Sequence, residues 1–155
     1  MTADTLNRWL TLGANVGVLI GIALLLIELN QNELMMRAQT RTELSNGIVE
    51  ILNLSASNPQ LASLIRRADN GEELSADEYF QYQHRSFALF RYLENLHYQY
   101  RLGLYGEREF SAQRKAWESY LNRSKAAWKT WCVYRLTVSP EFRALVDGQL
   151  QQNSC

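Results

Sequence analysis

The sequence predicts an all-α protein, in which one N-terminal transmembrane helix continues into a soluble bundle of about four or five helices. Three observations predict this fold class. A long uncharged run lies near the N-terminus, apolar residues recur at helical spacing through the rest of the chain, and its 155 residues include only two prolines and eight glycines. Such a scarcity of helix breakers favours long helices over many short strands.

The uncharged run covers residues 9–27 and ends in a block of aliphatic side chains. A helix needs about 20 mostly apolar residues to cross the hydrocarbon core of a bilayer, which is about 30 Å thick. We therefore expect a short N-terminal tail at 1–8 and a transmembrane helix at 9–29. A cleavable signal peptide would have a shorter apolar stretch followed by a cleavage site of small residues. The segment 28–32 after the run is polar and contains no such site, so we expect an uncleaved anchor. A buried helix of a soluble protein is the remaining alternative.

Beyond the membrane, the next helix breaker after Gly21 is Gly47, so the anchor helix is expected to extend through 30–57. A soluble helical bundle follows at 58–150, and a frayed tail at 151–155.

Local signals divide the bundle into helices. Ser75 and Glu78 have the spacing of a capping box, in which each side chain satisfies a backbone N–H of the other residue. Asn58 and Ser139 each precede a proline, a pattern typical of a helix start. Gly71 and Gly103 follow helical segments and suit helix C-termini.

Charge and cysteine content limit the location and the partners. Sixteen basic and sixteen acidic residues give a net charge of zero, which argues against a nucleic-acid partner. Cys132 and Cys155 show no disulfide framework, and free thiols fit a reducing compartment. Arg37 and Arg41 follow the span, whereas Arg8 precedes it together with the terminal amine. Two arginines against one favour a bundle on the cytoplasmic side, whereas counting the terminal amine removes this excess.

Small residues inside the span predict self-association. Gly13, Gly17 and Gly21 repeat every four residues, so they lie on nearly one face, where two helix backbones can approach closely. Glu28 falls on the same face. Asn15 points to roughly the opposite side and also needs a partner in lipid. We expect a homo-oligomer. The alternative is that glycine is simply common in membrane helices.

Glu28 also suggests a second function, that of an ion channel or pore. In a ring of parallel helices its carboxylates would form a circle near the pore mouth, an arrangement that can select cations. The favoured alternative is a carboxylate that reaches the interface or pairs with Arg37 or Asn32, because tightly packed glycines leave little lumen.

Glu94 and His97 have the Glu-x-x-His spacing that di-iron bundles use to place two ligands on one helix face. Such a site needs a second motif and further carboxylates, whereas the chain has one motif and only one other histidine, His84. A hydrogen-bonded glutamate within the bundle is the more ordinary outcome. We therefore expect no metal and no cofactor, and a di-iron-type enzyme is the least favoured alternative.

Several segments together resemble a broad group of uncharacterised bacterial single-pass membrane proteins with a C-terminal helical domain. The matching residues are Asn15–Gly21, Glu28–Asn32, Glu94-Asn95 with Gln99 and Gly103, and Ser139–Arg143. The resemblance implies a bacterial inner membrane and a helical domain, but no known activity. The expected protein is a non-enzymatic scaffold, sensor or accessory subunit whose partners are the lipid bilayer, its own copies and other membrane proteins.

Overall fold

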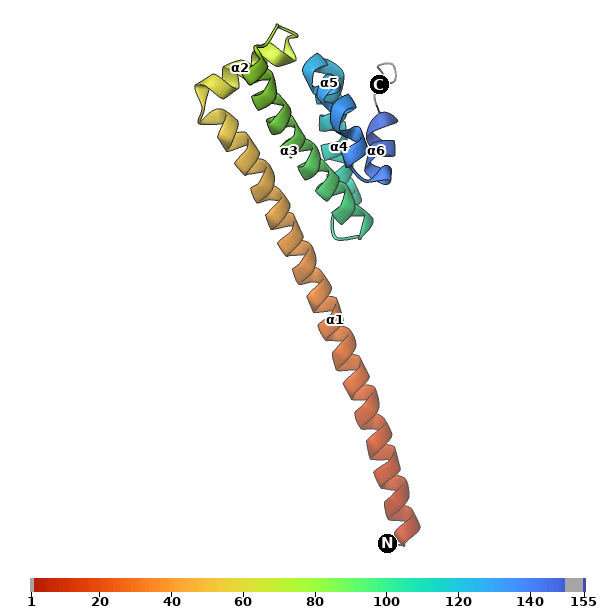
Figure 1. Cartoon of the computed structure of the whole chain (residues 1–155). Helices are drawn as coiled ribbons and strands as arrows, with labels where there is room; N and C mark the ends of the chain where they lie inside the picture. The colour runs from red at the N-terminus through yellow and green to blue at the C-terminus, as the bar shows by residue number, and fades with distance from the viewer. Residues whose placement is uncertain (1, 150–154) are drawn as a thin grey trace. The chain divides into compact units, whose positions relative to one another are not determined.

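The computed structural model describes residues 2–149 and 155, and all regular structure in this part of the chain is helical. The helices are α1 (Ala3–Ala56), α2 (Pro59–Asp69), α3 (Ala76–Arg101), α4 (Glu107–Arg123), α5 (Lys125–Tyr134) and α6 (Pro140–Asp147), with a short 3-10 turn, η1, at Arg135–Thr137 (Figure 1). The predicted all-α class, with a long N-terminal helix followed by a helical bundle, is confirmed. Apart from Cys155, the predicted frayed tail 151–155 lies outside the described residues.

The chain divides into two compact units, Met1–Gln39 and Thr40–Cys155. The described part of the first unit consists almost entirely of α1, which begins at Ala3. The second unit contains the remaining residues of α1, up to Ala56, together with α2 to α6. The second unit begins at Thr40, inside the segment predicted as the helical extension 30–57, and each unit is described below by itself.

Side-chain caps set the starts of the helices after α1. Asn58 accepts the backbone N–H of Leu61 at 3.0 Å, ahead of Pro59 at the first position of α2. The predicted capping box is present at α3, where Ser75 and Glu78 satisfy each other's backbone N–H groups. Such caps stabilise a helix start by about 1 kcal/mol.

Two serines begin the last helices in the same way. Ser124 accepts the N–H of Ala127 at the start of α5, and Ser139 accepts the N–H of Phe142 at the start of α6. Gly71 and Gly103 follow α2 and α3 with φ of 79° and 74°, in the left-handed region that favours glycine. The predicted helix ends at these two glycines are confirmed.

Aromatic rings from α3 to α6 form the centre of the bundle. Trp131 and Phe142 are fully buried, with ring centroids 5.9 Å apart in an edge-to-face arrangement. Phe90 contacts Trp131 at 5.3 Å, and Trp117 contacts Phe142 at 6.2 Å. Edge-to-face pairs stabilise by about 0.5–1.5 kcal/mol beyond the area that they bury. Because α3 packs against α4, α5 and α6, it is the central helix of this core (Figure 1).

Candidate functional site

The first feature with functional meaning is the apolar N-terminal part of α1. An 18-residue window of this helix has a mean hydropathy of 2.4, and none of the window is buried against the rest of the chain. Among the described residues, α1 is the one helix long and apolar enough to cross a membrane. By length and composition it fits either a membrane span or an N-terminal signal sequence. The window does not fit the alternative of a buried core helix, because none of it is buried against the rest of the chain.

The three glycines of the span lie along one open face of α1. At about 100° per residue, steps of four advance only about 40° around the helix. No heavy atom outside the local helix backbone lies within 4 Å of the position that a Cβ would take at Gly13, Gly17 or Gly21. Among the described residues, no neighbouring atom therefore requires glycine at these three positions.

Two polar side chains accompany this face. Glu28 is exposed and lies two helical turns beyond Gly21 on the same side, whereas Asn15 is exposed on roughly the opposite side. Helical geometry thus groups the three glycines with Glu28 and separates Asn15 from them.

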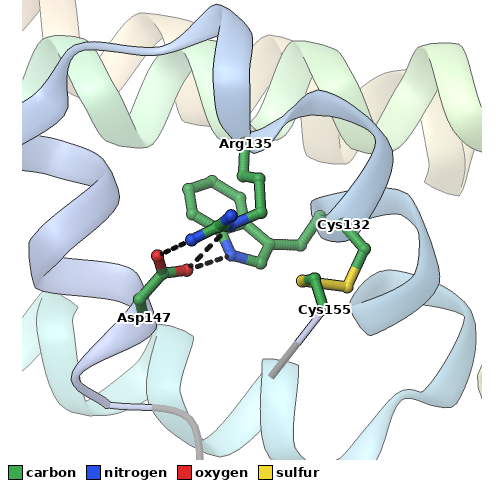
Figure 2. The surroundings of a disulfide bond; sticks show 5 residues. Cys132, Arg135, Asp147 and Cys155 are labelled. Atoms are coloured by element: carbon green, nitrogen blue, oxygen red, sulfur yellow. Dashed lines mark hydrogen bonds and ion pairs between the residues drawn. A yellow bond between two sulfur atoms is a disulfide. The ribbon is translucent and has the colours of Figure 1, made fainter. Parts of the chain in front are cut away.

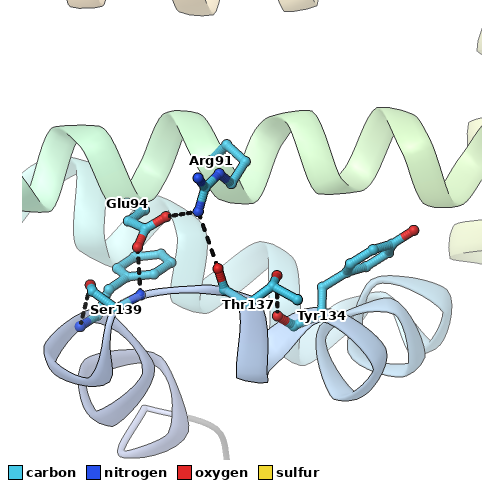
Figure 3. A network of polar contacts seen from close by, with 6 residues as sticks. Arg91, Glu94, Tyr134, Thr137 and Ser139 are labelled. Atoms are coloured by element: carbon cyan, nitrogen blue, oxygen red, sulfur yellow. Dashed lines mark hydrogen bonds and ion pairs between the residues drawn. The ribbon is translucent and has the colours of Figure 1, made fainter.

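Glu94 holds the beginning of α6. Its Oε1 accepts the backbone N–H of Ser139 at 2.6 Å, and its Oε2 accepts a hydrogen bond from Arg91 Nη1 at 2.6 Å (Figure 3). Arg91 also donates to the carbonyl of Thr137 at 3.3 Å. A backbone donor at a helix start needs such a partner, because it has none inside the helix. Glu94 therefore connects α3 to the start of α6.

The same contacts border an open hollow of about 290 Å³, which is lined by Arg91, Glu94, Asn95, Tyr98 and Ser139. Both oxygens of Glu94 are already engaged there. In the described part of the chain, no three His, Cys, Asp or Glu side chains gather as metal ligands would. The arrangement supports a role in positioning helices.

His97, three residues after Glu94, packs into the aromatic core. The side chain is 8% exposed, and its ring centroid lies 5.8 Å from Phe110 and 5.9 Å from Phe142. Burial lowers the pKa of His97 below its ordinary value of 6.5, and the charge of Arg101 lowers it further, although nearby carboxylates partly oppose the shift. The imidazole is therefore a neutral part of the core at pH 7.

A polar junction around Asp69 was not predicted. Its Oδ1 accepts hydrogen bonds from Ser124 Oγ at 2.5 Å, from Tyr82 Oη at 2.8 Å and, more weakly, from Tyr120 Oη at 3.5 Å. Tyr82 and Ser124 are almost completely buried. Burial raises the pKa of the Tyr82 hydroxyl well above its ordinary range, so it stays a donor. One carboxylate thereby joins α2, α3, α4 and the start of α5.

A second unpredicted cluster lies at the end of α6. Asp147 accepts a hydrogen bond from Trp131 Nε1 at 2.9 Å, and it also accepts hydrogen bonds from the Nε and Nη2 atoms of Arg135 (Figure 2). Cys132, between these two donors in sequence, forms a disulfide with Cys155. The expectation of free thiols is therefore wrong. A spacing of 23 residues with no further cysteines gives no pairing signal in the sequence.

Comparison with known proteins identifies no relative, because no family model, no curated protein and no solved structure matches the chain. The resemblance to bacterial single-pass membrane proteins stays a prediction.

Proposed function

We propose that this chain is a non-enzymatic, single-pass protein of a bacterial inner membrane, which self-associates through α1 and serves as a scaffold, sensor or accessory subunit of a membrane complex. The observation behind this proposal is the exposed apolar window of α1 with its open glycine face. The other candidate residues, Glu94 and His97, are used in packing the bundle.

The exposed window supports a membrane location. Side chains such as Leu19 and Leu26 are 66% and 61% exposed, and burying each away from water is worth about 1.5–3 kcal/mol. Lipid tails cover such a helix over its whole circumference, and the window is long enough to cross the hydrocarbon core.

The glycine face supports self-association. Lipid tails are as apolar as the helix, so helices associate in a membrane through close packing rather than through the hydrophobic effect. Gly13, Gly17 and Gly21 remove side chains along one face and allow a second backbone to approach. A second copy of α1 offers the same face at the same depth, which suits a parallel homo-oligomer.

Replacing Gly17 with leucine tests the proposal. The change adds a bulky side chain to the glycine face and keeps the span apolar, so insertion is preserved while close packing is lost. We expect the full-length variant in nanodiscs to show a smaller assembly than the wild type by native mass spectrometry. Ala23→Leu is the matched control, because it adds a similar bulk on another side of the same helix. An assembly of unchanged size in Gly17→Leu would contradict the proposal.

The position of Glu28 favours one second candidate, an ion-conducting oligomer. Glu28 shares the glycine face, so parallel copies would bring their carboxylates together near one edge of the membrane. Purified protein would then conduct cations in planar bilayers, and Glu28→Gln would reduce the preference for cations. Bilayers that stay silent with assembled wild-type protein would exclude this candidate and leave the scaffold proposal standing.

A further inference from the structure

We infer that a thiol–disulfide oxidoreductase outside the cytoplasm oxidises Cys132 and Cys155, and that the bundle Thr40–Cys155 therefore lies on that side of the membrane. The inference goes beyond the proposed function, because it holds whether or not the chain self-associates. It reverses the cytoplasmic placement that the basic residues around the span favoured.

The backbone positions of the two cysteines suit a disulfide. Their Cα atoms are 5.4 Å apart, inside the range of about 4.4–6.8 Å that a disulfide requires. Cys132 lies in the last turn of α5, and Cys155 follows α6. The bond therefore joins the segment after α6 back to α5.

Noncovalent contacts hold the end of α6 against the residues around Cys132. Asp147, the last residue of α6, is hydrogen-bonded to Trp131 and Arg135, which stand on either side of Cys132 in the sequence. Cys155 is eight residues after Asp147, and a chain of that length can span up to about 28 Å. The hydrogen bonds of Asp147 to Trp131 and Arg135 therefore raise the effective concentration of the Cys155 thiol at Cys132.

The exposure of the cysteines suits exchange with an enzyme. Cys155 is exposed and Cys132 is half-buried. The Cys155 thiolate attacks the disulfide of the oxidoreductase and forms a mixed disulfide, which releases one enzyme thiolate. The Cys132 thiolate then attacks the Cys155 sulfur and releases the second enzyme thiolate. This chain loses two electrons and two protons, and the enzyme disulfide becomes a dithiol.

The same exposure selects the compartment. Cytosolic reductants keep accessible thiols reduced, whereas disulfides form and persist outside the cytoplasm. The basic residues oppose this topology only weakly. Arg8 lies directly before the uncharged run, Arg37 and Arg41 lie farther beyond its end, and long domains are translocated largely regardless of their charge.

Acid quenching of cells, followed by alkylation with a heavy maleimide, tests the redox state of the full-length chain. We expect no tag on the wild type before reduction and two tags after it, with one tag on Cys155→Ser without reduction.

Asp147→Ala should acquire the disulfide several-fold more slowly in a pulse-chase experiment. In cells that lack the thiol–disulfide oxidoreductase outside the cytoplasm, Cys132 and Cys155 should remain free thiols. Free thiols in wild-type cells, or a disulfide that forms normally without that oxidoreductase, would overturn the inference.

Single introduced cysteines test the side of the membrane. In a Cys132→Ser/Cys155→Ser background, Arg108→Cys probes an exposed position of α4, and Thr2→Cys probes the other end of the span. With a membrane-impermeant maleimide on intact cells, we expect Arg108→Cys to react at once and Thr2→Cys only after permeabilisation. The reverse pattern would place the bundle in the cytoplasm and overturn the inference.

Discussion

The two units of the molecule use the same apolar side chains in opposite ways. In the first unit, Leu19 and Leu26 are 66% and 61% exposed, whereas Leu93 and Leu96 in the second unit are 3% and 0% exposed. Leucine is equally apolar in both places, so the difference comes from what the chain supplies around it. In the residues that the structure describes, the second unit supplies the five helices α2 to α6 in addition to its part of α1, whereas the first supplies only α1. The described part of the first unit therefore has no core of its own around these leucines.

Truncating a large apolar side chain should have the largest effect on stability, and this effect should differ between the two units. Phe142→Ala removes a fully buried ring that contacts both Trp117 and Trp131, and such changes cost about 3–5 kcal/mol. We expect a loss of this size in the unfolding free energy of the second unit, measured by denaturant titration of the full-length protein in detergent. Leu26→Ala is the control in the span and should leave that free energy unchanged. Equal losses in both variants would mean that Leu26 belongs to the bundle core.

The disulfide should contribute the next largest effect, and only in the second unit. In the loop-entropy description, closing a loop of 23 residues is worth about 3 kcal/mol. Cys132→Ser/Cys155→Ser should therefore unfold at a lower denaturant concentration than the oxidised wild type. Wild-type protein with its disulfide reduced is the control and should unfold at a similar concentration to the double variant. A double variant as stable as the oxidised protein would show that the bond contributes nothing to folding.

Helix boundaries were predictable because they depend on residues close together in the sequence. A cap involves partners about three positions apart. Asn58, Ser75 and Ser139 could therefore be identified from their neighbours, and the structure confirms each one. The apolar window of the first unit was equally visible, because its hydropathy is a property of one continuous segment.

The polar clusters of the second unit were not predictable by the same means. Asp69 and Ser124 are 55 residues apart, and Trp131 and Asp147 are 16 apart, so their contacts depend on tertiary packing. Glu94 illustrates the opposite problem. Its spacing from His97 matched a metal-ligand motif, but its partner in the fold is the backbone of Ser139, 45 residues away. The spacing shows which residues share a helix face but not which groups that face meets.

Removal of one buried hydroxyl from α3 should lower the unfolding free energy more than removal of an exposed one. Tyr82→Phe takes a buried donor from Asp69 and leaves the ring in place, so we expect a loss of about 1 kcal/mol in the unfolding free energy. Tyr98→Phe is the matched control on the same helix, because Tyr98 is 54% exposed, and it should change stability by less than about 0.5 kcal/mol. Equal effects in calorimetry would indicate that the Asp69 junction does not stabilise the bundle.

The smallest expected effect is a dependence of bundle stability on mild acid. Because burial lowers the pKa of His97 below 6.5, the unfolded chain takes up a proton in a pH range where the folded chain does not. Stability should therefore fall as the pH drops below about 7 and should stop falling, for this group, below the native pKa. Denaturant titrations at successive pH values would show this slope. His97→Gln should flatten it, and a slope that persists unchanged in that variant would assign the effect to other groups.

The lowered pKa values of Glu78 and Asp147 also make stability fall as the pH drops, but only near and below their ordinary values of 4.5 and 3.8. The pH range of these carboxyl groups can therefore be separated from that of His97.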